Sequence, residues 1–315
     1  MKTWLIGAGV MAQDYCKVLV AQGVDFDVIG RGLGSAKSFE AVTGKAVFAG
    51  GLEKALRAHK APDCAIIAVG VESLTDTAQR LIHAGTRRLM VEKPGGLNTL
   101  QIQSLAEKAI RYNAEVFIAY NRRFYAATSL ARALIEEDGG AVSCNFEFTE
   151  WSHKIATITL GAGVKKAWFL ANSTHVVDLA FHLCGFPKDW HCWHGGSLDW
   201  HPSAARFCGS GITEQDVFFS YHADWEAPGR WGVEVLTRNR RFVLRPMELL
   251  QVTELGSVKL ESVMLDDQLD KEYKPGLFMQ TSAFIEHRDS LFCSIGEQRR
   301  HCDLYEQMAG YKSGI

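Results

Sequence analysis

The feature that most constrains the fold is a glycine-rich turn between a strand and a helix near the beginning of the chain. Residues 3–6 form a short apolar strand, and the segment Gly7-Ala8-Gly9-Val10-Met11-Ala12 leads from it directly into a helix. Gly7 permits a tight turn, Gly9 lets the backbone approach a pyrophosphate, and Ala12 is small enough for close helix packing. Free N–H groups at the start of the helix favour phosphate. The pattern predicts a dinucleotide-binding unit.

The end of the second expected strand, residues 26–29, bears on the choice of cofactor. A domain that binds NAD usually carries an acidic residue there, about 20 residues after the glycines, because the carboxylate binds the ribose hydroxyls. This chain has Gly30-Arg31 instead, followed by Ser35 and Lys37. A guanidinium can bind phosphate oxygens in bidentate fashion, so we expect NADP in preference to NAD. The alternative is that Arg31 only stacks on the adenine of either cofactor.

Strands and helices alternate through the first third of the chain. We expect strands at residues 65–69, 89–91 and 115–120, and helices at 74–84 and at 98–110, where Asn98 could cap the first turn. This order is typical of a parallel, doubly wound sheet, the Rossmann fold. Residues 1–120 are therefore assigned to a dinucleotide-binding domain, with Val69 and Glu92 as further candidates for cofactor contacts.

The pattern changes near Asn121-Arg122-Arg123. Long strands are expected at residues 141–151, 217–225, 231–237, 241–244 and 257–265, separated by short polar or glycine turns, and two amphipathic helices follow at 278–289 and 297–308. Successive strands joined by short turns favour an antiparallel sheet. Residues 121–315 are therefore expected to form an α+β domain with a large, mainly antiparallel sheet, which binds substrate and mediates oligomerisation.

The sequence Glu92-Lys93-Pro94 ends an apolar strand abruptly. Pro94 cannot donate a ladder hydrogen bond, so Lys93 is presented at the carboxyl end of the strand. Ligands of open α/β sheets bind at that end, and a lysine there can hydrogen-bond a substrate hydroxyl and tune its acidity. The alternative is a solvated lysine in a loop between strand and helix.

A second candidate group lies in the other half of the chain, where residues 172–183 have a helical pattern with Asn172 or Ser173 as N-cap. At 3.6 residues per turn, His175, Asp178 and His182 share one face. A histidine at the start of a helix can act as a general base, and the field of the helix N-terminus tends to keep it neutral. The alternative is a histidine of the core or the surface.

Together, the glycine turn, Glu92-Lys93-Pro94 and His175-x-x-Asp178 resemble the glucose-fructose oxidoreductase and inositol dehydrogenase family (Gfo/Idh/MocA) over nearly the whole chain. The resemblance implies that Lys93 orients and polarises the reacting oxygen and that His175 exchanges its proton. Many members carry an aspartate four residues before the histidine, where this chain has Ala171. Asn172 and Asp178 are therefore added to the catalytic candidates, because either side chain could help to orient the site.

Members of that family oxidise or reduce a secondary alcohol or carbonyl of a sugar, sugar nucleotide or cyclitol with NAD(P), and the resemblance implies such an activity here. Candidates for substrate contacts are Lys93, His175, Tyr120, Arg122 and Lys165, of which Arg122 and Lys165 could meet a phosphorylated or nucleotide-linked substrate. Two alternatives remain open: a glycosidase that oxidises its substrate transiently with bound NAD, and a cofactor-sensing regulatory protein that has lost the chemistry.

Composition excludes several other classes of protein. A formal charge of -2 gives no electrostatic reason to expect nucleic acid or an anionic membrane as partner, and no apolar run approaches the roughly 18 residues of a membrane helix. The eight cysteines are scattered without a C-x-x-C pair, which favours reduced thiols in a cytoplasmic protein. No zinc site is expected, because Cys192-Trp193-His194 lacks its ligand spacing. A homodimer or homotetramer is expected through the second sheet, since a large apolar face is rarely left on a monomer.

Overall fold

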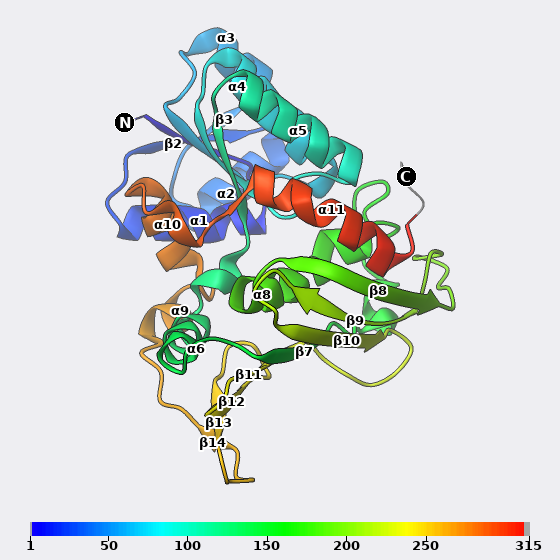
Figure 1. Cartoon of the computed structure of the whole chain (residues 1–315). Coiled ribbons are helices and arrows are strands. Elements are labelled where there is room, and N and C mark those ends of the chain that lie inside the picture. The colour runs from blue at the N-terminus through cyan, green and yellow to red at the C-terminus, as the bar shows by residue number, and fades with distance from the viewer. Residues whose placement is uncertain (1, 312–315) are drawn as a thin grey trace.

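The computed structural model describes residues 2–311, which form two sheets with helices packed around each of them (Figure 1). The first sheet has the strand order β15-β6-β5-β4-β1-β2-β3 and is parallel except for the pair β15 and β6. Its strands are β1 (Thr3–Ile6), β2 (Phe26–Gly30), β3 (Val47–Ala49), β4 (Cys64–Ile67), β5 (Arg88–Glu92), β6 (Glu115–Ala119) and β15 (Cys293–Ser294). The predicted doubly wound parallel sheet is confirmed.

The helices of this part follow the expected alternation and are α1 (Val10–Ala21), α2 (Leu33–Thr43), α3 (Gly51–Ala58), α4 (Leu74–Ala84) and α5 (Thr99–Arg111), with a 3-10 turn η1 (Val71–Ser73). The predicted cap of α5 is confirmed, because the side chain of Asn98 accepts a hydrogen bond from the backbone N–H of Gln101. Gly7 has φ +130°, and a Cβ atom there would lie 2.2 Å from the carbonyl oxygen of Ala68. Only glycine therefore fits the turn between β1 and α1.

The second sheet has the order β14-β13-β12-β11-β7-β10-β9-β8. Its strands are β7 (Ser143–Glu147), β8 (Pro187–Gly195), β9 (Arg206–Thr213), β10 (Phe218–Asp224), β11 (Gly232–Leu236), β12 (Arg240–Leu244), β13 (Gln251–Glu254) and β14 (Glu261–Ser262). All neighbours run antiparallel except β7 and β10, which are parallel. The prediction of a mainly antiparallel second sheet is confirmed.

Two details of the second sheet differ from the sequence-based expectation. The strands β8, β9 and β13 were not predicted. In β9 the pattern is broken by Gly209 and Gly211, residues that usually weaken a strand. In the structure a Cβ atom at either glycine would lie within 2.6 Å of an aromatic ring of β10, Tyr221 or Phe219. The glycines therefore make room for those rings. The expected strand at 257–265 is mostly irregular and contains only the two residues of β14.

Helices cover one face of the second sheet. They are α8 (Thr174–Cys184), which packs on β7 and β11, and α6 (Ala126–Glu137), which packs on β12 (Figure 1). The short elements η2 (Asn121–Phe124), α7 (Ser152–Ile155) and the π-helical turn η3 (Phe169–Ser173) complete this part. The prediction that Asn172 or Ser173 caps α8 was wrong, because η3 runs directly into the helix and no side chain caps its first N–H groups.

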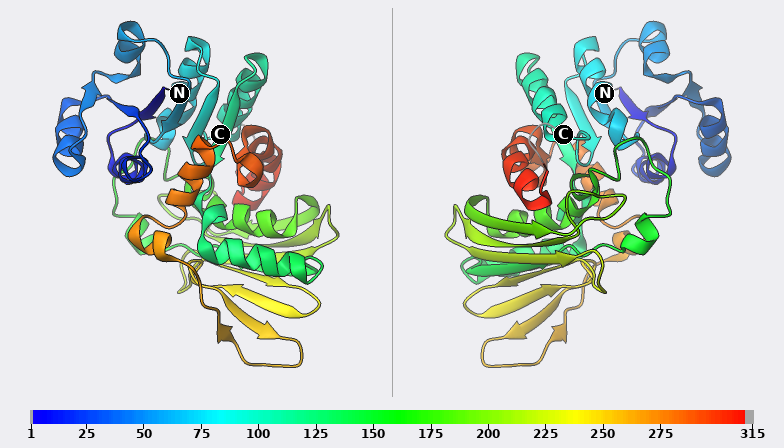
Figure 2. Two further views of the ribbon diagram at one scale, coloured as in Figure 1. Left: turned by 90° about the vertical axis from the view of Figure 1, so that its left-hand side faces the viewer. Right: turned by 90° about the vertical axis from the view of Figure 1, so that its right-hand side faces the viewer.

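The chain returns to the first sheet near its C-terminal end. The last elements are α9 (Gln268–Glu272), α10 (Leu277–Ile285), η4 (Asp289–Leu291), β15 and α11 (Ile295–Ala309). Helix α11 packs against α5 on one side and against β8 and β9 on the other (Figure 2). It therefore joins the two parts of the molecule. Within residues 2–311, no helix has both the length and the apolar character needed to cross a membrane.

Candidate active site

Lys93 stands directly after β5, at the carboxyl end of the first sheet, as the sequence predicted. Its Nζ atom donates a hydrogen bond of 2.6 Å to the backbone carbonyl of Ala171, which lies in the second part of the chain. Burial lowers the pKa of Lys93 to about 8, and the neighbouring carboxyl of Glu92 opposes this shift. Because this value is close to neutrality, Lys93 can exchange a proton or donate a hydrogen bond under physiological conditions.

His175 lies in the first turn of α8 and is 6% exposed. The ring of Tyr120 packs edge-on against it with centroids 5.7 Å apart, and the ring of Trp231 lies at 6.1 Å. Burial, together with the charges of Arg122 and Lys93, lowers the pKa of His175 well below its ordinary value. The imidazole is therefore neutral at physiological pH and can accept a proton.

Lys93 and His175 line one cavity of about 500 Å³ between the two parts of the chain. The other residues of its wall are Met11, Val69, Val71, Glu92, Asn121, Arg122, Tyr125, Asn172, Glu248, Lys274 and Pro275. The cavity has a size typical of small-molecule sites. The structure thus brings together four residues that were predicted as catalytic or substrate-binding: Lys93, His175, Asn172 and Arg122.

Glu150 belongs to the same region and was missed in the sequence. Its Oε1 atom accepts hydrogen bonds from Asn172 Nδ2 at 3.0 Å and from Ser173 Oγ at 2.8 Å. Burial raises the pKa of Glu150 to about 7, although these two hydrogen bonds act in the opposite direction. Glu150 lies near the end of the expected strand at 141–151 and belongs to no motif, so only the fold reveals that it binds the amide of Asn172.

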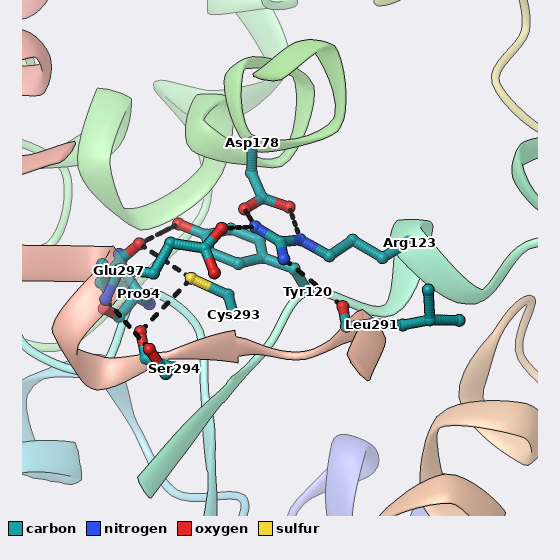
Figure 3. A network of polar contacts seen from close by, with 9 residues as sticks. Pro94, Tyr120, Arg123, Asp178, Leu291, Cys293, Ser294 and Glu297 are labelled. Atoms are coloured by element: carbon teal, nitrogen blue, oxygen red, sulfur yellow. Dashed lines mark hydrogen bonds and ion pairs between the residues drawn. The ribbon is translucent and has the colours of Figure 1, made fainter. Parts of the chain in front are cut away.

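The structure places Asp178 away from the cavity, in the network of Figure 3. Its carboxylate accepts two hydrogen bonds from the guanidinium of Arg123, at 2.6 and 2.9 Å, and Arg123 also donates to Glu297 at 2.6 Å. Cys293 lies beside the two acids, but the arginine already supplies the positive charge that a metal would bring. Since Nδ1 of His175 has no hydrogen-bond partner within residues 2–311, Asp178 does not orient the imidazole by direct contact.

Two residues predicted to bind substrate lie outside the cavity wall. Tyr120 is completely buried behind His175 and exchanges hydrogen bonds with Gln298. Lys165 donates to the backbone carbonyl of Ala156 at 2.7 Å, in an exposed loop. Tyr120 was predicted because it ends an expected strand, and Lys165 because it belongs to a basic pair, Lys165-Lys166. Neither pattern determines which way the side chain points.

Most residues predicted for the cofactor follow or end the strands β1, β2, β4 and β5, and Glu92 and Lys93, at the end of β5, line the cavity. A Cβ atom added to Gly9 would meet nothing within 4 Å, so open space lies next to the backbone where α1 begins. Met11 and Val69 line the cavity, whereas Ala8, Val10 and Ala12 belong to the turn and first turn of α1. The open space at Gly9 and the free N–H groups of the helix fit a bound pyrophosphate.

The residues predicted to select the cofactor are solvent-exposed. Arg31 follows β2, while Ser35 and Lys37 lie in the first turns of α2. The hydroxyl of Ser35 donates to the carbonyl of Gly32 at 3.0 Å. Exposed side chains at this strand end are free to meet the adenosine ribose of a dinucleotide.

Comparison with known proteins agrees with this geometry. Residues 1–120 match the model of the oxidoreductase family GFO_IDH_MocA, which is described by its NAD-binding Rossmann fold. No protein of curated function matches the sequence. UDP-N-acetylglucosamine 3-dehydrogenase GnnA from Acidithiobacillus ferrooxidans has a similar structure, with a TM-score of 0.77 and 16% identity over 99% of this chain and 97% of that one.

Two further solved structures are similar over the same extent. Levoglucosan dehydrogenase, in complex with NADH and levoglucosan, has a TM-score of 0.76 and 15% identity over 99% of this chain and 96% of that one. An oxidoreductase from Agrobacterium radiobacter, in complex with NAD+, L-tartaric acid and magnesium, has a TM-score of 0.77 and 12% identity over 100% of this chain and 97% of that one. These likenesses extend the shared fold to the whole chain.

Residues 1–120 match the NAD-binding Rossmann fold of the Gfo/Idh/MocA oxidoreductase family, the family that the glycine turn and the Glu-Lys-Pro motif resemble. The rest of the chain shares the fold of the solved dehydrogenase structures.

Proposed function

We propose that this protein is an NAD(P)-dependent dehydrogenase or reductase that acts on a secondary alcohol or carbonyl of a sugar-like substrate. The observation that carries the proposal is that Lys93 and His175, from different domains, line one cavity together with Met11 and Val69 of the cofactor side. The names of the similar structures, which include sugar and sugar-nucleotide dehydrogenases, support a substrate of this class.

In the oxidative direction the substrate hydroxyl would lie between Lys93 and His175. The bound nicotinamide supplies the hydride acceptor at its C4 atom. The neutral imidazole of His175 takes the hydroxyl proton as the carbon–hydrogen bond breaks and the carbonyl forms, so the substrate loses one hydride and one proton. The ammonium of Lys93 donates a hydrogen bond to the same oxygen and stabilises its developing negative charge. Because burial lowers the pKa of Lys93 to about 8, its amine can also take part in transferring that proton.

The activity can be tested by mixing the purified protein with either cofactor and a panel of free sugars, sugar acids, inositols and nucleotide sugars. Expected is a change in absorbance at the nicotinamide band with at least one member of the panel, lost in the Lys93→Ala variant. Release of a sugar without a net absorbance change would indicate a glycosidase with transient oxidation instead. Binding of cofactor without turnover of any member would indicate a sensor.

The cofactor is proposed to be NADP(H), with NAD(H) as the weaker alternative. The support is the exposed Arg31 at the end of β2, where NAD-binding domains usually carry an acid. Fluorescence titration should give tighter binding of NADPH than of NADH, and Arg31→Ala should narrow the difference. A preference for NADH of tenfold or more in the unmodified protein would refute the assignment.

A homodimer or homotetramer through the second sheet is also proposed. On the face of β8 to β10 opposite α8, side chains remain exposed, among them Trp193 at 59% and Phe218 at 66%. They alternate with polar residues such as Ser220 and His222, a mixture common in protein interfaces. Light scattering at micromolar concentration should give a multiple of 34.9 kDa, and a monomer mass would contradict this proposal.

A further inference from the structure

Positive charge gathers on the cavity wall around the proposed reaction site. Lys93, Arg122 and Lys274 line the cavity, together with the acids Glu92 and Glu248. Two of these groups are engaged elsewhere: Oε1 of Glu92 accepts a hydrogen bond of 2.8 Å from the hydroxyl of Tyr15, and Lys274 forms an ion pair of 3.7 Å with Asp14. Lys93 and Arg122 then face Glu248. The wall therefore keeps more positive than negative groups available for a ligand.

Arg122 differs from other arginines that are largely buried in this protein. Arg88, Arg123 and Arg240 each form an ion pair with at least one carboxylate at 3.0 Å or less. Within residues 2–311, Arg122 forms no ion pair closer than 4.0 Å, and its buried Nε atom has no hydrogen-bond partner. Its side chain makes one long hydrogen bond, of 3.5 Å, to Asn121 Oδ1.

Arg122 is partly exposed where it faces the cavity, but its Nε atom is buried without a hydrogen-bond partner. A charged group that is largely withdrawn from water is normally paired, because it loses hydration and otherwise gains little in return. In agreement, burial lowers the pKa of Arg122. The missing carboxylate would be supplied by a ligand in the cavity that the guanidinium lines.

Aromatic rings fix the guanidinium in place. The ring of Trp231 lies 4.8 Å from the guanidinium carbon of Arg122, and the ring of Tyr125 lies 5.8 Å from it. Trp231 also packs beside His175, with ring centroids 6.1 Å apart. A ligand group bound to Arg122 would therefore lie close to His175, where the proposed function places the substrate.

We propose that the substrate carries an oxyanion, either a carboxylate or a phosphate, which Arg122 binds while another carbon of the same molecule is oxidised or reduced. This inference rests on the proposed function for its redox part only. A planar guanidinium held by the rings of Trp231 and Tyr125 can donate hydrogen bonds to two oxygens of such a group. A neutral sugar would bind less tightly, because it would leave the charge of Arg122 unpaired. A sugar acid or sugar phosphate is thus favoured over a neutral cyclitol.

The test measures binding by calorimetry to the complex of full-length protein with reduced cofactor, so that it does not depend on turnover. The ligands are glucose, glucuronate, glucose 6-phosphate and UDP-glucose, which share a ring and differ in their charged group. At least one charged member should bind tenfold or more tightly than glucose. Arg122→Met should remove most of that advantage, Arg122→Lys should restore part of it, and Arg57→Met, at an exposed position of α3, should leave it unchanged.

The pattern among the charged ligands identifies the source of the oxyanion. Equal or tighter binding of glucose, no binding of any member, or a charged-ligand affinity that is unchanged in Arg122→Met would overturn the inference. A melting temperature of the ligand-free Arg122→Met variant at or above that of the unmodified protein shows that it folds. It is expected because the change removes a charge without an ion-pair partner and a buried Nε atom without a hydrogen-bond partner. Charge-dependent binding without redox turnover would refute the proposed function alone, and turnover of neutral sugars only would refute this inference alone.

Discussion

Replacing Glu150 by glutamine should change how the stability of the protein depends on pH. Glu150 is 3% exposed, and burial raises its pKa from the usual 4.5 to about 7. At about 1.4 kcal/mol per pKa unit, this difference corresponds to about 3 kcal/mol between the two protonation states. The folded protein thus favours the neutral carboxyl, which donates and accepts hydrogen bonds much as a glutamine amide does.

The direction of the effect follows from linkage. Below about pH 4.5 the carboxyl is neutral in both the folded and the unfolded chain, and its contribution to stability is fully present. Between about pH 4.5 and about pH 7 the unfolded chain releases the proton while the folded chain retains it, so stability is lost progressively. Glutamine does not titrate, and the Glu150→Gln variant should therefore gain about 3 kcal/mol relative to the unmodified protein over this range.

Urea denaturation of the ligand-free protein at several pH values between about 4.5 and 8 provides the measurement, with fluorescence and circular dichroism transitions required to coincide. Titrating groups that do not interact with Glu150 cancel in the difference. The charge of Glu150 raises the pKa of Lys93, which is about 8, so the comparison is made on the data below about pH 7. Glu107→Gln, at an exposed position of α5, is the matched control and should show a constant difference. If the difference for Glu150→Gln also stayed constant, within about 0.5 kcal/mol, Glu150 would not be neutral in the folded protein.

Three further predictions concern chemistry, cofactor and packing. Lys93→Ala and His175→Ala should each lower kcat roughly 100- to 10,000-fold. The double variant should lose little more activity, because the effects of two groups that act on one hydroxyl are not additive. If His175→Ala kept kcat within about threefold of the unmodified protein, His175 would not be the base. Gly9→Ala should leave the melting temperature unchanged but weaken cofactor binding, because its Cβ atom would enter only the open space. Gly7→Ala should lower the melting temperature, because its Cβ atom would collide with the backbone carbonyl of Ala68. Equal changes in the two melting temperatures would contradict this reasoning. Asp178→Asn should reduce the free energy of unfolding by about 3–5 kcal/mol, because it breaks the buried ion pair with Arg123. A loss below about 1 kcal/mol in urea denaturation would show that this ion pair contributes little to stability.

The parts of the fold that could be predicted from sequence are those in which local pattern and tertiary role agree. The strand and glycine turn at residues 3–12 belong to this group, because the positive φ of Gly7 is a backbone conformation that favours glycine. Pro94 belongs to it as well, because proline has no N–H group to continue β5. The Asn98 cap is equally local. Strand β9 could not be predicted, since Gly209 and Gly211 are favoured there by the rings of Tyr221 and Phe219 from the neighbouring strand.

The candidate site shows the same division. Lys93 and His175 were predicted as site residues because each belongs to a motif, and the fold then places both in one cavity. Asp178 shares a helical face with His175 in sequence, but Arg123 draws its carboxylate to another network. Glu150 could not be predicted, because a single acid near the end of an expected strand belongs to no pattern. Long-range pairing decides such cases, and one sequence does not contain that information.

The pairing of β15 with β6 has a consequence for dividing this protein into fragments. Ser294 and Cys293 lie opposite Phe117 and Ile118 and occupy the outer edge of the first sheet. A fragment that ended at residue 120 would expose the backbone N–H and C=O groups of that edge, which is a template for edge-to-edge association. The cofactor-binding unit is thus continuous in space and discontinuous along the chain. A circular permutant that carried residues 293–309 in front of residue 2 would keep the sheet complete, and it is the rational starting point for producing that unit alone.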